Sequence, residues 1–92
     1  MLLEECRNVN VAGCQVLGAR TRGIDVRGGS VIRISDSNIR PRQDDKDFKA
    51  SIRVDDASTA VMVSSCFVAK GSDGDVLLPA KSGAASGNVV VP

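Results

Sequence analysis

The chain contains no histidine, tryptophan or tyrosine, and only two phenylalanines, among its 92 residues. The absence of histidine excludes the Ser-His-Asp triad and every other catalytic scheme or zinc site that needs an imidazole. The three cysteines lack CxxC spacing, so a closed cysteine-rich metal site is excluded as well. The scarcity of aromatic rings leaves aliphatic side chains to build the core.

The chain also lacks an excess of charge of either sign. Lys plus Arg is 12 against 11 for Asp plus Glu, a net charge of +1, which argues against a general nucleic-acid binder. No apolar run approaches about 18 residues, so no membrane-spanning helix is expected. The opening MLLEEC has neither the basic region nor the long apolar stretch of a secretory signal. We therefore expect a soluble chain with no nucleic-acid or membrane partner, and its cellular compartment is left open.

What the sequence does contain is a repeat, which begins at residues 8, 31 and 60, at intervals of 23 and 29 residues. Its three copies are NVNVAGCQV, VIRISDSNI and AVMVSSCFV. Each copy has an aliphatic–any–aliphatic triplet, then two small or polar residues, a small residue, one outward residue and a closing aliphatic residue. A period in the twenties, carried by short β-rich triplets, is typical of a solenoid.

A second aliphatic triplet precedes or follows each copy, in GIDVRG (23–28), SIRVDD (51–56) and DVLLPA (75–80). Each turn of chain thus offers three short strands with period-two alternation. The triplet 89–91 repeats the first triplet once more, and residues 80–88 before it are expected to be flexible. The sequence predicts an all-β solenoid of about four coils, with three short strands per coil, as a single domain over residues 1–92. The alternative is a small β-sandwich with accidental self-similarity.

This pattern resembles the right-handed parallel β-helix of the pectin-lyase-like superfamily, which includes pectate lyases, polygalacturonases and phage tailspikes. The resemblance covers roughly residues 2–91 and rests on three strands per coil, a constant two-residue second corner and the small residues Cys14, Ser37 and Cys66 beside it. It implies a short right-handed parallel β-helix, either free-standing or a piece of a longer one. These are features of a fold, so they imply a function only weakly.

The residues available for catalysis are Asp, Glu, Arg and Lys. Asp55 and Asp56 follow a first strand, where glycosidases of this superfamily can carry catalytic carboxylates. Adjacent residues point apart, however, whereas a glycosidase pair must face one substrate at about 5–9.5 Å. The Gly-His-Gly and Arg-Ile-Lys motifs of polygalacturonases are absent. No catalytic set and no cofactor is predicted; calcium enters only under a lyase alternative, for which Asp44, Asp45 and Asp47 offer oxygen ligands without the spacing of a calcium loop.

A ligand is expected on the face of the first strands, beside the insertion at residues 40–49. Asp25 and Arg53 take equivalent outward positions on adjacent coils about 4.8 Å apart, so they either pair with each other or form the floor of a sugar-binding cleft. Arginines of the insertion can hold a uronate carboxylate, because guanidinium matches carboxylate as a fork. If they stack with Arg20 and Arg22 one coil earlier, they form a basic edge; the alternative is that Asp44, Asp45 and Asp47 neutralise them. The candidate ligand-binding set is Asp25, Arg40, Arg42, Arg53 and Asp55.

Two functions from different classes follow. The first is a non-catalytic β-helix module used for assembly or binding, with an anionic polysaccharide as the candidate ligand. The alternative is a remnant or subunit of a polysaccharide lyase or glycoside hydrolase, with its cleft on the face of the first strands.

The chain is also expected to pair with itself. Each end of a β-solenoid exposes unpaired backbone groups and the aliphatic cross-section of its core. Pro79 and Pro92 blunt the strands near the C-terminus, because proline cannot donate to a further strand, whereas the opening strands have only the carboxylates Glu4 and Glu5 to oppose pairing. The sequence predicts a homodimer through the N-terminal coils, with the interface residues Leu2, Leu3, Val9 and Val11.

Overall fold

A computed structural model describes residues 1–42 and 46–91, and the regular structure of these residues is entirely β-strand. The strands form three parallel sheets of four strands each. Sheet A consists of β1 (Leu2–Glu4), β4 (Arg22–Arg27), β7 (Ala50–Val54) and β10 (Val76–Leu77). Sheet B consists of β2 (Arg7–Ala12), β5 (Ser30–Ser35), β8 (Thr59–Ser64) and β11 (Gly83–Ser86). Sheet C consists of β3 (Gln15–Ala19), β6 (Asn38–Pro41), β9 (Phe67–Val68) and β12 (Val89–Val90).

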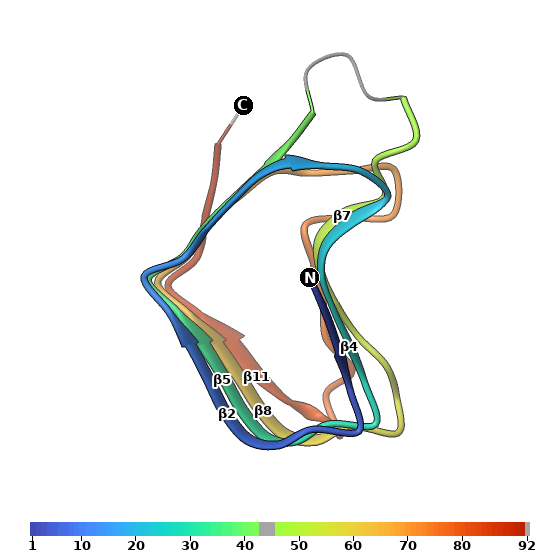
Figure 1. Ribbon diagram of the computed structural model, residues 1–92, viewed down its shortest axis with the longest axis vertical. Coiled ribbons are helices and arrows are strands. Elements are labelled where there is room, and N and C mark those ends of the chain that lie inside the picture. The colour runs from blue at the N-terminus through green and yellow to red at the C-terminus, as the bar shows by residue number, and fades with distance from the viewer. Residues whose placement is uncertain (43–45, 92) are drawn as a thin grey trace.

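Each turn of the chain passes through sheet A, then sheet B, then sheet C. Figure 1 shows the four turns lying over one another in a three-sided outline. The pairing is parallel and in register throughout sheet B, where Ile34 pairs with Val11 on one side and with Val63 on the other. The predicted parallel β-helix, with four coils of three strands, is confirmed.

The core is a stack of inward-facing aliphatic side chains. Along β5 and β8 buried and exposed residues alternate, as the period of a strand requires. Ile24, Ile34 and Ile39, one from each sheet of the second coil, are fully buried. Burying each such side chain contributes about 1.5–3 kcal/mol. Val9 and Val16 occupy inward positions of the first coil and are only partly buried, because no coil covers them on their outer side.

The corner between sheets B and C has the same conformation in every coil. Its second residue has a left-handed backbone in all four turns, with φ of 63°, 52°, 56° and 67° at Gly13, Asp36, Ser65 and Gly87. Glycine adopts this conformation without strain, and polar residues such as aspartate tolerate it better than aliphatic ones. The two-residue corner predicted from the sequence therefore has a left-handed second residue in all four coils.

The residue after each left-handed position points into the molecule, and these residues stack through the four coils. The Ser37 hydroxyl accepts a hydrogen bond from the Cys14 N–H (3.3 Å), and the Asn88 side-chain oxygen accepts one from the Cys66 N–H (2.9 Å). Cys66 is fully buried, and burial raises the pKa of its thiol, so it stays protonated and packs as a small apolar residue. Cys14 is only partly buried because it lies in the end coil, and all three cysteines are free thiols.

The C-terminal coil corrects one expectation from the sequence. Val89 and Val90 form β12 in sheet C, paired with β9, whereas the triplet 89–91 suggested a strand of sheet B. The sheet B strand is β11, inside the segment 80–88 that was expected to be flexible, and it pairs in register with β8. Its inward positions hold Gly83 and Ala85, so it lacks the aliphatic pattern. A side chain at Gly83 would collide with the carbonyl oxygen of Val61, so the close approach of these strands requires glycine.

The insertion at residues 40–49 links β6 to β7, and its described end is fixed to the coils. Phe48 is 5% exposed and packs against Ala19 and Ala69. The N–H of Lys49 donates to the carbonyl oxygen of Thr21 (2.8 Å) in the preceding coil. Asp44 and Asp45, the carboxylates considered for calcium, lie outside the described residues, as does Pro92.

A second left-handed row crosses sheet B at the second residue of three strands. Asn8, Val31 and Ala60 have φ of 57°, 57° and 55°. Asparagine tolerates this conformation, but a β-branched residue is a true outlier there. Val31 is also 54% exposed, so little burial offsets its backbone strain.

The Val31→Asn variant is expected to raise the free energy of unfolding by about 0.5–1 kcal/mol, because asparagine relieves the left-handed strain that valine suffers. The matched control is Val89→Asn, since Val89 is 52% exposed and lies outside the left-handed region. Urea unfolding of the two variants measures the difference. If Val31→Asn does not raise the free energy of unfolding more than Val89→Asn does, the backbone at Val31 is not strained.

Candidate functional site

The outer face of sheet A carries a three-residue ion network. Asp25 on β4 pairs with Arg53 on β7 in the strand register, and its Oδ1 lies 3.1 Å from Arg53 Nη1. Its Oδ2 accepts from Arg27, at 2.9 Å from Nη2 and 3.1 Å from Nε. The predicted Asp25–Arg53 pair is thus confirmed. Arg27 was missed, although its position two residues after Asp25 on the same face of a strand was a usable signal.

The network uses both oxygens of Asp25, whose side chain is only 12% exposed. Both oxygens of this carboxylate already accept from guanidinium groups, so a substrate or a metal ion would have to compete with the two arginines. Of the two arginines, Arg53 is 32% exposed and Arg27 is 47% exposed at the side chain. The network therefore joins the second and third coils.

Asp55 closes the corner between β7 and β8. Its carboxylate accepts the N–H of Gly28 in the preceding coil, at 3.1 and 3.2 Å, and the hydroxyl of Ser58 at 2.6 Å. The hydrogen bond from Ser58 is the largest cause of the lowered pKa of Asp55, and the Gly28 N–H adds to it. Asp56 lies beside it with a side chain 79% exposed, 4.0 Å from Lys81. The two carboxylates therefore have different partners, Gly28 and Ser58 for Asp55 and Lys81 for Asp56.

The candidate ligand-binding set divides between two sheets. Arg53 and Asp55 line a hollow of about 580 Å³ beside sheet A, with Asp56, Leu77 and Pro79 among its walls. Arg40 lies on β6 of sheet C and lines a different hollow, described next. These two hollows share no lining residue, so the structure does not bring Arg40 together with Asp25, Arg53 and Asp55.

The hollow around Arg40 has a volume of about 420 Å³. Its other lining residues are Pro41, Ala69, Lys70, Val90 and Val91. Arg40 is partly buried and Lys70 is exposed, and neither forms an ion pair with any residue in the ranges 1–42 and 46–91. Two cations with apolar neighbours and no carboxylate in the lining make a place for an anionic group.

Lys70 was not singled out from the sequence. The repeat aligns Asn38 with Phe67, and these two residues pair in the structure. Three residues further along the chain from each, the same register places Lys70 opposite Pro41. Arg42 follows Pro41, and its N–H donates to the carbonyl oxygen of Ala19 (2.9 Å). Since Ala19 pairs with Pro41, Arg20 and Arg42 take equivalent places in adjacent coils, as the basic edge requires.

Within the described part of the chain, no group of three or more His, Cys, Asp or Glu residues is placed to hold a metal ion. The same residues include no helix long and apolar enough to cross a membrane. No protein-family model, no curated protein and no solved structure matches this chain. The fold is therefore established by the strand topology, and function has to be argued from the surfaces.

The Asp55→Asn variant is expected to lower the free energy of unfolding at neutral pH by about 1 kcal/mol, because charge-assisted hydrogen bonds across the corner are weakened. The folded-state pKa of Asp55 lies below its ordinary value of 3.8. The stabilisation is therefore complete above that value and is lost as the pH falls through the lowered pKa.

Urea unfolding of both proteins from neutral to strongly acidic pH should show the difference shrinking only in the acid range. The control is Asp56→Asn, which removes a solvent-exposed carboxylate and should change little. A difference that is independent of pH, or equal for both variants, would contradict the corner role of Asp55.

Proposed function

We propose that the chain is a non-catalytic β-helix module, a divergent member of the pectin-lyase-like superfamily, that binds an anionic polysaccharide and pairs with itself. The single observation that carries the binding half is the hollow lined by Arg40 and Lys70. Its two cations are not neutralised by neighbouring carboxylates within the described residues. A guanidinium and an ammonium group together suit a polymer with a carboxylate on each sugar.

The non-catalytic half is supported by the state of the carboxylates on sheet A. Both oxygens of Asp25 accept from arginines, and both oxygens of Asp55 accept hydrogen bonds at the corner. These hydrogen bonds hold both carboxylates against neighbouring protein groups, whereas a general base has to reach the proton of the substrate. The face on which an enzyme of this fold was expected to work thus uses these carboxylates to join its coils.

The alternative, a polysaccharide lyase or glycoside hydrolase remnant, draws support from the hollow beside Arg53 and Asp55, which is larger than that around Arg40. Incubation with polygalacturonate, with and without calcium, separates the two functions. We expect no unsaturated product and no new reducing ends. Turnover that is lost in Arg53→Ala would favour the alternative.

Arg40→Ala combined with Lys70→Ala is expected to weaken binding of a galacturonate oligosaccharide by about tenfold or more, since each change removes a charge-assisted contact. Binding should also weaken as salt rises, because these groups lie at the surface. Titration calorimetry measures both effects. Arg33→Ala, which removes a cation from sheet B, is the matched control. Binding that the double variant retains, or equal binding of a neutral glucan, would contradict the assignment.

Self-pairing is supported by the edges of the first coil. The strands β1, β2 and β3 each have a neighbouring strand on one side only, so their other side offers unpaired backbone groups. Leu3 and Val9 are partly buried, Leu2 is 55% exposed and Val11 is 7% exposed. Most of the apolar surface that the proposed interface would bury therefore belongs to Leu2, Leu3 and Val9. Val11 contributes little of it.

The Leu2→Glu variant is expected to shift a dimer of the chain to monomer, because it places a charge in an apolar contact between two copies. Sedimentation velocity at micromolar concentrations measures the change. Met62→Glu alters a side chain of similar exposure, 47%, on β8, and should leave the dimer intact. A wild-type chain that stays monomeric at high micromolar concentration would refute self-pairing.

A further inference from the structure

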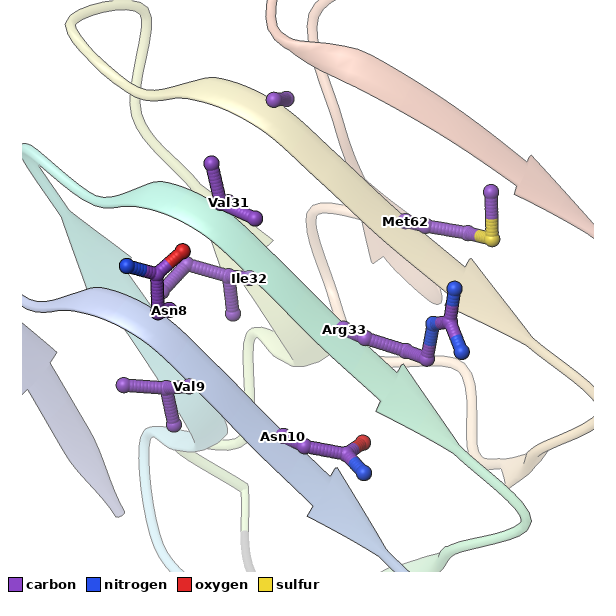
Figure 2. A pocket seen from close by; sticks show the side chains of 8 residues that line it. Asn8, Val9, Asn10, Val31, Ile32, Arg33 and Met62 are labelled. Carbon is purple, nitrogen blue, oxygen red and sulfur yellow. The ribbon is translucent and has the colours of Figure 1, made fainter.

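The outer face of sheet B contains a groove of about 330 Å³ that belongs to neither hollow described above. One side is formed by the left-handed row Asn8, Val31 and Ala60, and the other by Asn10, Arg33 and Met62. Figure 2 shows Asn8 and Val31 on one side, Asn10, Arg33 and Met62 on the other, and Val9 and Ile32 between them. Because Asn10 pairs with Arg33 and Arg33 with Met62, the groove crosses three strands.

The composition of the groove changes along its length. Its first coil provides two side-chain amides, Asn8 and Asn10, and its second coil provides the guanidinium of Arg33 opposite Val31. Its third coil provides Ala60 and Met62. One end is therefore rich in hydrogen-bonding groups and the other is apolar. Val31 and Met62 are 54% and 47% exposed, and both are ready to lose water on binding a ligand.

Val31 is unfavourable for the stability of the free chain on two counts. It is a β-branched residue with a left-handed backbone, and it exposes its side chain to water. The equivalent positions in the adjacent coils hold Asn8 and Ala60, which suffer less from this conformation. Backbone strain of this kind, with no gain in core packing, points to a use for the side chain outside folding.

Sheet B also differs from sheet A in charge. The sequences of β2, β5, β8 and β11 contain no Asp or Glu, and their only charged residues are Arg7 and Arg33. Neither arginine forms an ion pair with any part of the chain that the structure describes, whereas Arg27 and Arg53 on sheet A both pair with Asp25. A partner for this face should carry negative charge.

We infer that the sheet B groove binds a short acidic peptide segment of a partner protein, in which an apolar side chain lies next to a carboxylate. Each asparagine presents a donor and an acceptor and can pair with a peptide group. Arg33 matches the carboxylate, and Val31 and Met62 receive the apolar side chain, with Met62 able to adapt its shape. The exposed apolar side chains Val31 and Met62 in the lining favour a peptide that carries an apolar side chain over a polar saccharide. The site and its ligand are independent of the Arg40 hollow.

The test uses the ¹⁵N-labelled chain and a short capped peptide of alternating leucine and aspartate, followed by NMR. Amide resonances at 8–10, 31–33 and 60–62 should shift at peptide concentrations of about 1 mM or below. The same peptide with lysine in place of aspartate should cause no shifts. Arg33→Ala should weaken binding by about tenfold, and the matched control Arg40→Ala should leave it unchanged.

Val31→Asn gives the sharper result, because it should weaken peptide binding while stabilising the fold, and a misfolded variant cannot do both. The inference is overturned if millimolar acidic peptide shifts none of these resonances, or if Arg33→Ala and Val31→Asn bind as tightly as the wild type. It is also overturned if a galacturonate oligosaccharide, rather than the peptide, produces shifts that depend on Arg33.

Discussion

The register of the whole molecule depends on the corner between sheets B and C. The second residue of this corner has the same left-handed backbone in every coil, and the next residue turns inward. Because the corner never varies in length, the start of each sheet C strand is fixed relative to the sheet B strand before it. Inside the stack, Ser37 and Asn88 accept N–H groups of neighbouring coils, so the polar backbone that must turn beside the core is satisfied. With this register, the inward-facing aliphatic side chains of successive coils lie directly over one another.

This constraint determines where function can lie. The inward side chains are committed to a narrow core, so only outward positions and links of variable length are free to bind anything. On sheet A the outward charges bind one another across coils, as Asp25 and Arg53 do. On sheets B and C the outward cations have no such partners within the described residues. The surfaces suited to ligands are therefore those where the charge of Arg33, Arg40 and Lys70 is not used for stability.

The parts of the structure that repeat could be predicted from the sequence, because each inward triplet has a recognisable period and the corner keeps its length. The Asp25–Arg53 pair followed from that register alone. The strand at Gly83–Ser86 could not be found in this way, since glycine and alanine in inward positions leave no aliphatic pattern. The hollow around Arg40 could be recognised only in the folded structure, because Lys70 and Val90 reach it from the two later coils. The left-handed backbone at Val31 was also hidden, since valine is the residue type least expected in that conformation.

The central claim is that four coils stack in parallel with one continuous register. Methyl NOE measurements on the isotope-labelled chain test it most directly. The account predicts cross-peaks from Val11 to Ile34, from Ile34 to Val63 and from Val63 to Ala85, in that order, because these side chains face inward on successive strands of sheet B. Strong contacts between Cα protons of neighbouring strands, which antiparallel pairing brings close together, would contradict the account and indicate a β-sandwich instead.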